Sequence, residues 1–225
     1  MQPNDLAQAR PLGSCRSCAS VRDAMIPDGT TLAPFSGDVD LEKLLRLAPS
    51  THTIKGAFVA TNAAIVAKEW PQIEASLRAP PRAGQYLPFS DYPLADFLRV
   101  TDAAARRRYP GMPTCESHRL LSRATFETFS QTTLGRVTLA LVSGPGSLLM
   151  KYEEIFNRML HGPRVTVRST GERSVEVSYV GYFGTREAIF GVLEGSVIAC
   201  QFEPTVVVET KGDGRYLARV SWAPW

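Results

Sequence analysis

The chain has 225 residues, and hydrophobic residues make up 44% of them, so it is long enough to bury one substantial core. Its 25 Lys and Arg residues nearly balance its 22 Asp and Glu residues, and the resulting charge of +3 gives no indication of a nucleic-acid partner. Because no run of about 18 apolar residues is present and the N-terminus lacks the basic and then apolar order of a signal peptide, we expect a cytoplasmic protein without a membrane span.

The N-terminal residues 1–38 are rich in Pro, Gly, Ser, Thr and Asp and show no helical or strand period. This composition predicts an irregular or flexible arm, followed by a single domain over residues 39–225. The first helix of that domain is predicted to begin after the N-cap Asp40 and to end before Pro49. Its buried face carries Leu41, Leu44 and Leu45.

Three further helices are predicted in the first two thirds of the chain. One spans 53–68, where apolar residues share a face. The next follows Asp91, which suits an N-cap, and ends in the arginines at 106–108, where the helix dipole favours positive charge. The longest helical pattern covers 116–142, with apolar residues at offsets of three and four.

The hydrophobic period changes in the last third of the chain. A helix over 146–160 has the strongest amphipathic pattern, after which the period falls from about 3.6 to 2. The new period predicts a hairpin over 165–179, a helix over 185–200 and a second hairpin between 205–210 and 215–222. The sequence therefore predicts an α+β fold, in which an N-terminal helical layer packs on a C-terminal antiparallel β-sheet of order β-β-α-β-β.

Four segments carry a resemblance to a known family. The most specific is Phe89–Arg99, with the sequence FSDYPLADFLR, and the others are TLGRV at 133–137, GVLEG at 191–195 and the closing strand 216–222. Through these segments, which extend over about 41–222, the chain resembles a family of uncharacterised proteins found mainly in myxobacteria. The family has no established activity to carry over, and the N-terminal arm lies outside its pattern.

The order of helices and hairpins resembles the fold shared by heme-nitric-oxide-binding domains, vinyl-reductase-type domains and vesicle-tethering (TRAPP) subunits. That likeness implies either a small-molecule pocket between helices and sheet or a dimeric scaffold, usually without enzymatic activity. None of the three histidines, His52, His118 and His161, lies in a motif from which a heme ligand can be transferred. We therefore predict no cofactor from the resemblance.

Cysteine and histidine residues at two places have the spacing of zinc ligands. Cys15 and Cys18 form a CxxC pair, and Cys115 and His118 form a CxxH pair, so the four together suit tetrahedral zinc. The pairs are far apart and the first lies in the predicted arm, so unpaired thiols in loops are the commoner interpretation. Redox chemistry at Cys15 and Cys18 is less well supported, because the strand and helix of a thioredoxin-like site are missing around them.

No catalytic constellation is predicted. Helix capping accounts for Asp91, and pairing with Arg99 or Arg136 accounts for Asp96. Solvation accounts for the carboxylates at 153–154, and no nucleophile elbow, phosphate-binding loop or HExxH motif is present.

The function predicted from these patterns is that of a non-catalytic sensory or adaptor module. Its partner is expected to be a small apolar molecule or another protein. A homodimeric scaffold without a ligand is the first alternative, and a zinc-stabilised domain or an enzyme of unknown reaction is the second.

Overall fold

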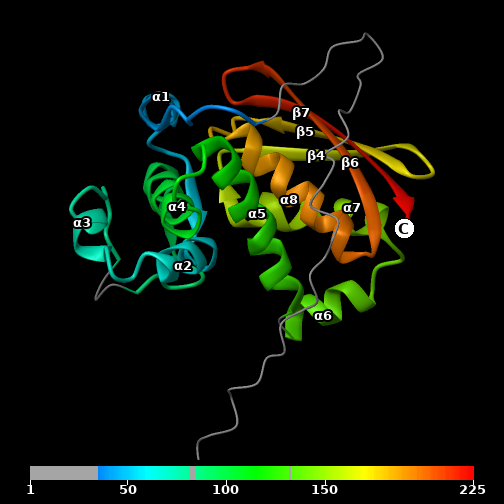
Figure 1. The fold of residues 1–225 in the computed structure, drawn as a ribbon, viewed down its shortest axis with the longest axis horizontal. Helices are drawn as coiled ribbons and strands as arrows, with labels where there is room; N and C mark the ends of the chain where they lie inside the picture. Colours follow the sequence, from blue (N-terminus) through cyan, green and yellow to red (C-terminus); the bar gives the residue numbers. More distant parts are fainter. Residues whose placement is uncertain (1–34, 82–84, 132) are drawn as a thin grey trace, which may run out of the picture. The chain divides into compact units, whose positions relative to one another are not determined.

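The computed structural model describes residues 35–81, 85–131 and 133–225, and Figure 1 shows their helices and strands. The helices are α1 (Leu41–Leu47), α2 (Gly56–Ile65), α3 (Trp70–Glu74), α4 (Leu94–Arg108), α5 (Thr114–Gln131), α6 (Thr133–Ala140), α7 (Pro145–Met159) and α8 (Arg186–Ala199). The strands are β1 (Thr53–Lys55), β2 (Asp91–Pro93), β3 (Leu160–His161), β4 (Arg164–Gly171), β5 (Ser174–Val180), β6 (Phe202–Gly212) and β7 (Arg215–Pro224). Within these ranges no helix is both long and apolar enough to cross a membrane.

A four-stranded antiparallel sheet dominates the C-terminal half, with the strand order β4-β5-β7-β6. β5 pairs with β7 along its whole length, from Ser174 to Val180, so the two predicted hairpins share one hydrogen-bonded ladder. α7 and α8 pack against one face of this sheet (Figure 1), where alternate strand residues are buried. Those residues include Val165, Val177, Val208 and Ala218. The predicted α+β fold, with helices packed on a C-terminal antiparallel sheet, is confirmed.

A second sheet, with the strand order β2-β1-β3, is absent from the sequence prediction. Its central strand, Thr53–Lys55, lies where a helix is expected, and α2 begins only at Gly56. The prediction that Asp91 caps a helix is also wrong, because Asp91 lies in β2 and accepts a hydrogen bond from Lys55 Nζ at 2.8 Å. Strands of two or three residues are too short to show a period, and their partners lie far away in the chain.

The helix boundaries confirm two predicted caps. The side chains of Asp40 and Thr185 each accept a hydrogen bond from the backbone N–H three residues later, at 2.9 and 3.1 Å. The helix expected over 116–142 corresponds to α5 and α6, which cover residues 114–131 and 133–140. α7 follows Gly144, whose φ of 141° lies in a region that favours glycine.

The outer edge of β4 is closed by side chains of α7. Asn157 Nδ2 donates to the carbonyl oxygen of Val165 at 2.8 Å, and Asn157 Oδ1 accepts from the Val165 N–H at 2.9 Å. Glu153 accepts a further hydrogen bond from the Val167 N–H at 2.7 Å. Solvation alone therefore does not account for Glu153. Its carboxylate accepts a hydrogen bond from a backbone N–H of the edge strand β4, which would otherwise lack a partner in the protein.

Asn157→Ala is expected to lower the free energy of unfolding by about 1–3 kcal/mol, because the N–H and C=O of Val165 lose their partners. Urea unfolding measures the change. Lys151→Ala, at an exposed position of the same helix, is the matched control and should stay within about 0.5 kcal/mol of the parent. Equal losses in the two variants would contradict the role of Asn157.

α5 packs directly on α8 at two glycines of the latter helix. A Cβ atom at Gly191 would lie 2.1 Å from the carbonyl oxygen of Arg119, and one at Gly195 would lie 3.2 Å from that of Arg123. The spacing of these glycines predicts close packing against the sheet. The close packing is confirmed, but the neighbour is a helix.

Candidate functional site

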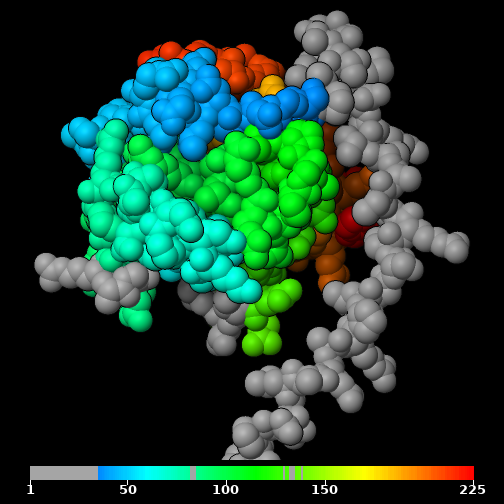
Figure 2. All heavy atoms as spheres, turned by 60° about the vertical axis from the view of Figure 1, so that its left-hand side comes forward, coloured from blue at the N-terminus to red at the C-terminus, as the bar shows by residue number. Residues whose placement is uncertain are grey.

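A surface pocket of about 280 Å³ lies where residues 38–40, α1, the start of α5, the loop before α8 and the β6–β7 turn meet. Figure 2 shows the blue N-terminal part of the described chain, including α1, between the green helices and the orange-red hairpin. The apolar part of the wall includes Val39, Leu44, Leu47 and Phe183. The polar part includes Lys43, Thr185, Arg186, Glu187 and Asp213. The pocket thus offers both an apolar surface and charges of both signs.

The segment Phe35–Val39, which we call the N-terminal segment, is held on the first turn of α5. Asp38 Oδ1 accepts hydrogen bonds from the N–H and hydroxyl of Thr114 at 3.1 and 3.0 Å, and the N–H of Val39 donates to Thr114 Oγ1 at 2.7 Å. The backbone and side-chain hydrogen bonds from Thr114 lower the pKa of Asp38. A carboxylate at a helix N-terminus satisfies a free N–H and complements the dipole, which explains why this segment stays beside α5.

A buried chain of three side chains lies behind the pocket. His118 Nε2 lies 3.1 Å from Asp102 Oδ1, and His118 Nδ1 lies 3.4 Å from Thr185 Oγ1. Burial alone would raise the pKa of Asp102, but hydrogen bonds from His118 and Arg106 outweigh it and hold the pKa below its ordinary value. Because the three residues come from α4, α5 and the N-cap of α8, the chain joins these helices beneath the pocket.

Asp102→Asn is expected to weaken the acid dependence of folding stability. The pKa of Asp102 is lowered in the folded state, so the ionised carboxylate contributes stability fully above its ordinary value of 3.8. That contribution is lost as the pH falls through the lower, folded-state pKa. Urea unfolding at a series of pH values should show parent and variant converging in acid. Asp213→Asn, in an exposed turn, is the control, and a difference for Asp102→Asn that does not change with pH would refute the expectation.

Arg119 on α5 is the centre of a buried ion-pair network. Its guanidinium donates to Glu116 Oε1 at 2.6 Å and to Glu194 Oε1, on α8, at 2.7 Å. The rings of Phe35 and Phe190 lie 5.8 and 5.3 Å from the guanidinium carbon. No sequence motif marks this network. The only signal is the glycine spacing in α8, which indicates that another element approaches closely.

The residues predicted to bind zinc are only partly described. Cys115 lines the pocket, and burial, together with Glu187, raises the pKa of its thiol. His118 points away into the buried chain, where Asp102 and Thr185 contact its two ring nitrogens. Cys15 and Cys18 lie outside the described residues, so the four-residue zinc site stays a prediction. In the ranges that the structure covers, no group of three or more His, Cys, Asp or Glu side chains is placed to hold a metal ion.

The carboxylate of Asp96 has a structural role. It is fully buried, and its two oxygens accept hydrogen bonds from the N–H groups of Arg78 and Ala79, each at 2.9 Å. Arg99 Nη1 lies 3.5 Å from Asp96 Oδ1, which confirms the expected pairing. Asp96 thus attaches the connection after α3 to α4.

The arrangement of helices and sheet is similar to that of solved H-NOX proteins. A K. algicida H-NOX protein in the Fe(II) unliganded state has a TM-score of 0.56 and 11% identity, over 76% of this chain and 97% of that one. An S. oneidensis H-NOX protein in the Fe(II)NO state has a TM-score of 0.57 and 14% identity, over 76% and 99%. A mutant T. tengcongensis H-NOX has a TM-score of 0.57 and 18% identity, over 76% and 99%. At these identities the likeness shows the fold alone.

Another similar solved structure is described in terms of heme distortion, so the fit of the described histidines to a heme group matters. An axial ligand needs a free lone pair beside a cavity that admits the macrocycle. Both ring nitrogens of His118 are engaged by neighbours, and His161 lies at the surface, 3.5 Å from Asp91. His52 packs so tightly on Gly162 that a Cβ there would lie 2.2 Å from its ring. None of these three histidines fits as a heme ligand.

The pocket itself does not fit heme either. Its volume of about 280 Å³ is slightly below the usual range for small-ligand sites, roughly 300–1,000 Å³. Cys115 is the thiol in its wall, and the raised pKa of that thiol disfavours the thiolate that binds iron. The described residues therefore disagree with the cofactor of the similar solved proteins.

Hemin added to the purified full chain is expected to give an absorption spectrum equal to the sum of the separate components. The reason is that His118 is hydrogen-bonded through its ring, His161 is exposed, and the ring of His52 packs tightly against Gly162. Optical titration checks this, with His118→Ala as the comparison. A saturable change at one equivalent that His118→Ala abolishes would contradict the fit described above.

No curated protein sequence matches the chain. Residues 48–223, however, match the model of a family described as protein of unknown function (DUF2378). This match confirms the expected resemblance to a family without an established activity, and the solved structures confirm the likeness to the heme-nitric-oxide-binding fold. The chain belongs to the DUF2378 family of proteins of unknown function.

Proposed function

We propose that this protein is a non-catalytic sensory or adaptor module that binds a small molecule in the pocket bounded by the N-terminal segment, α1 and the β6–β7 turn. The position of the pocket carries the proposal, because its wall combines residues from both ends of the described chain. A molecule bound there contacts several elements at once and favours the arrangement in which they meet. Occupancy of the pocket would then be communicated to a partner through that arrangement.

The wall of the pocket supports an amphipathic ligand better than a purely apolar one. Leu44, Leu47 and Phe183 favour an apolar body. Arg186 and Glu187, whose side chains are 3.1 Å apart, offer a charged donor and a charged acceptor to a polar end. A small molecule with an apolar body and one hydrogen-bonding group is therefore the class we propose.

Native mass spectrometry of the full chain purified from its source cells tests this proposal. The parent is expected to carry an added mass of a small molecule, and Leu44→Trp, which fills the pocket, is expected to lose it. Leu87→Trp, at an exposed position away from the pocket, is the matched control and should retain the mass. A parent chain without any added mass, or equal retention in both variants, would refute the pocket as a ligand site.

A homodimeric scaffold is the second candidate, and exposed apolar residues in α6, directly after it and in α7 favour it. Leu141 is 82% exposed, Val137 is 51% exposed and Met150 is 48% exposed. Val137 and Leu141 lie one helical turn apart, and exposed apolar side chains on a shared face commonly mark an interaction surface. Light scattering at increasing protein concentration, with Leu141→Ser for comparison, distinguishes a dimer through this surface from a monomer.

A further inference from the structure

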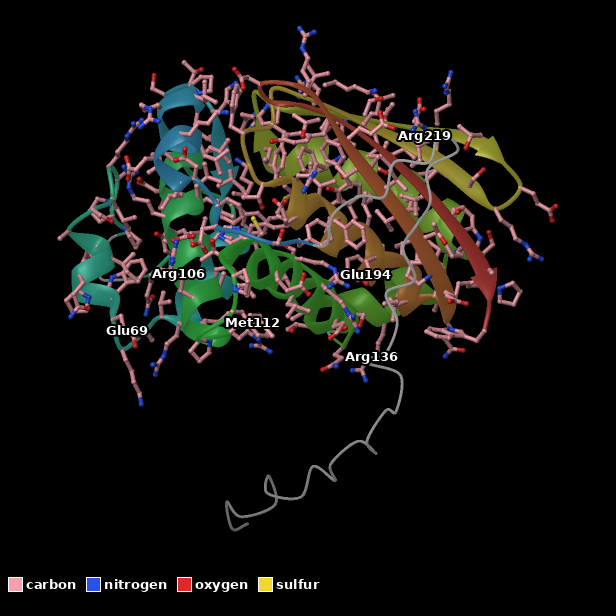
Figure 3. All side chains as sticks on the ribbon, turned by 45° about the horizontal axis from the view of Figure 1, so that its top comes forward. Glu69, Arg106, Met112, Arg136, Glu194 and Arg219 are labelled. Carbon is pink, nitrogen blue, oxygen red and sulfur yellow. The ribbon has the colours of Figure 1, made fainter. Side chains whose placement is uncertain are left out.

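The outer face of the four-stranded sheet is not covered by any described helix. α7 and α8 pack against the inner face only, and the outer residues of neighbouring strands point to the other side. Val180 is 52% exposed on this outer face, and the side chain of Arg219 is 52% exposed. In Figure 3 Arg219 lies on the strand layer, whereas Glu194 lies among the helices.

Positive charge predominates on this outer face. Five cations, Arg164, Arg168, Lys211, Arg215 and Arg219, accompany three carboxylates, Glu176, Glu203 and Glu209. Glu209 pairs with Lys211 and Arg219, and Glu176 pairs with Arg168 at 3.1 Å. Within the described ranges, Arg164 and Arg215 take part in no ion pair, so two charges on this face are free for a partner.

An apolar stripe crosses the same face diagonally. Val180 on β5 pairs with Arg215 on β7, so it is a diagonal neighbour of Leu217, two residues further along β7. Leu217 pairs with Glu209 on β6, so it is in turn a diagonal neighbour of Val207, two residues before Glu209. The stripe therefore runs Val180, Leu217, Val207. Diagonal neighbours in a sheet are about 7–8 Å apart, so the stripe is roughly 15 Å long.

The arginines lie on both sides of this stripe. The register puts Arg215 on one side and Arg219 on the other, while Arg164 lies next to Val180 on the neighbouring strand. A length of roughly 15 Å corresponds to about ten residues of an α-helix, or nearly three turns. The pattern is thus complementary to a helix that has one apolar ridge and acidic residues on both flanks of that ridge.

We propose that this outer face is a docking surface for an acidic amphipathic helix of a partner protein. A second copy of the chain would bring the same positive excess to the interface and would be repelled. Residues 1–34 contain three Arg and three Asp, so their net charge gives them no preference for this face. The docking surface is separate from the ligand pocket, and either can fail without the other.

Fluorescence anisotropy with the full chain and two labelled synthetic peptides tests the proposal. The probe peptide has about 18 residues, with leucines on one helical face and glutamates beside them, and the second peptide has the same composition in scrambled order. The probe is expected to bind the parent at least about tenfold more tightly than the scrambled peptide. The double variant Arg164→Glu/Arg215→Glu should weaken binding of the probe peptide by a similar factor, and Val180→Ser should weaken this binding by a smaller factor.

The matched control reverses two exposed arginines elsewhere, Arg46→Glu/Arg158→Glu, and should leave the affinity within about twofold. Circular dichroism and unfolding midpoints verify that every variant is folded. Equal affinity for the two peptides, or an equal effect of the two double reversals, would overturn the proposal. So would binding to phosphatidylserine-rich vesicles that requires Arg164 and Arg215 while the probe peptide fails to bind, since this result would assign the face to a membrane.

Discussion

Gly191→Ala is expected to lower the free energy of unfolding by about 3 kcal/mol. Alanine favours a helix by about 1 kcal/mol over glycine, so propensity alone predicts the opposite sign. The added Cβ, however, would lie 2.1 Å from the carbonyl oxygen of Arg119 and 2.9 Å from its carbonyl carbon. These are backbone atoms of α5, so α5 and α8 must separate to relieve the overlap. Guanidinium unfolding of the full chain measures the loss.

Gly146→Ala is the matched control for this substitution. Gly146 also lies in a helix, α7, but a Cβ there would be 3.4 Å from the ring of Trp222, which is ordinary contact with a side chain. The control is therefore expected to remain within about 1 kcal/mol of the parent. If both alanine variants changed stability alike, the close approach of α5 to α8 would not be the constraint at Gly191.

The second large effect is expected from Arg119→Ala, which should lower the free energy of unfolding by about 3–5 kcal/mol. The substitution leaves the buried carboxylate of Glu194 without its 2.7 Å partner and removes the pairing of Glu116. It also removes the cation that contacts the rings of Phe35 and Phe190. Guanidinium unfolding measures the loss, which includes the cost of an uncompensated buried charge.

A double-mutant cycle separates that cost from the net value of the ion pair. Arg119→Met combined with Glu194→Leu removes both buried charges and should recover much of the lost stability. Arg158→Ala is the surface control, since its 2.8 Å pairing with Glu154 joins two exposed side chains and should contribute less than about 1 kcal/mol. An Arg119→Ala loss no larger than that of Arg158→Ala would show that the network contributes little to folding.

The sequence predictions agree with the structure where a feature depends on residues close together in the chain, and they fail where it depends on distant residues. Alternation at Val175, Val177 and Tyr179 marks β5, and the hydroxyl of Thr185 caps α8, because both patterns depend on residues within one element. The three-residue strand at Thr53–Lys55 has no period of its own. It forms because β2 and β3 supply partners from other parts of the chain.

The candidate site shows the same division. Cys115 and His118 are three residues apart and suggest a common ligand, but the fold turns the thiol to the pocket and the imidazole to Asp102. The pair Arg119 and Glu194 has no sequence signature, since the two residues are separated by 75 positions. The pocket wall likewise combines α1 with the β6–β7 turn, which no local pattern connects.

The sequence by itself determined the class of the fold, the positions of the long helices and strands, and the two helix caps. These features arise from hydrophobic periodicity and local hydrogen bonds, which neighbouring residues specify. Only the tertiary structure decided the small sheet, the buried network at Arg119, the pocket and the arginines beside an apolar stripe. Those features depend on contacts between distant segments, whose geometry appears only when the helices and strands have packed.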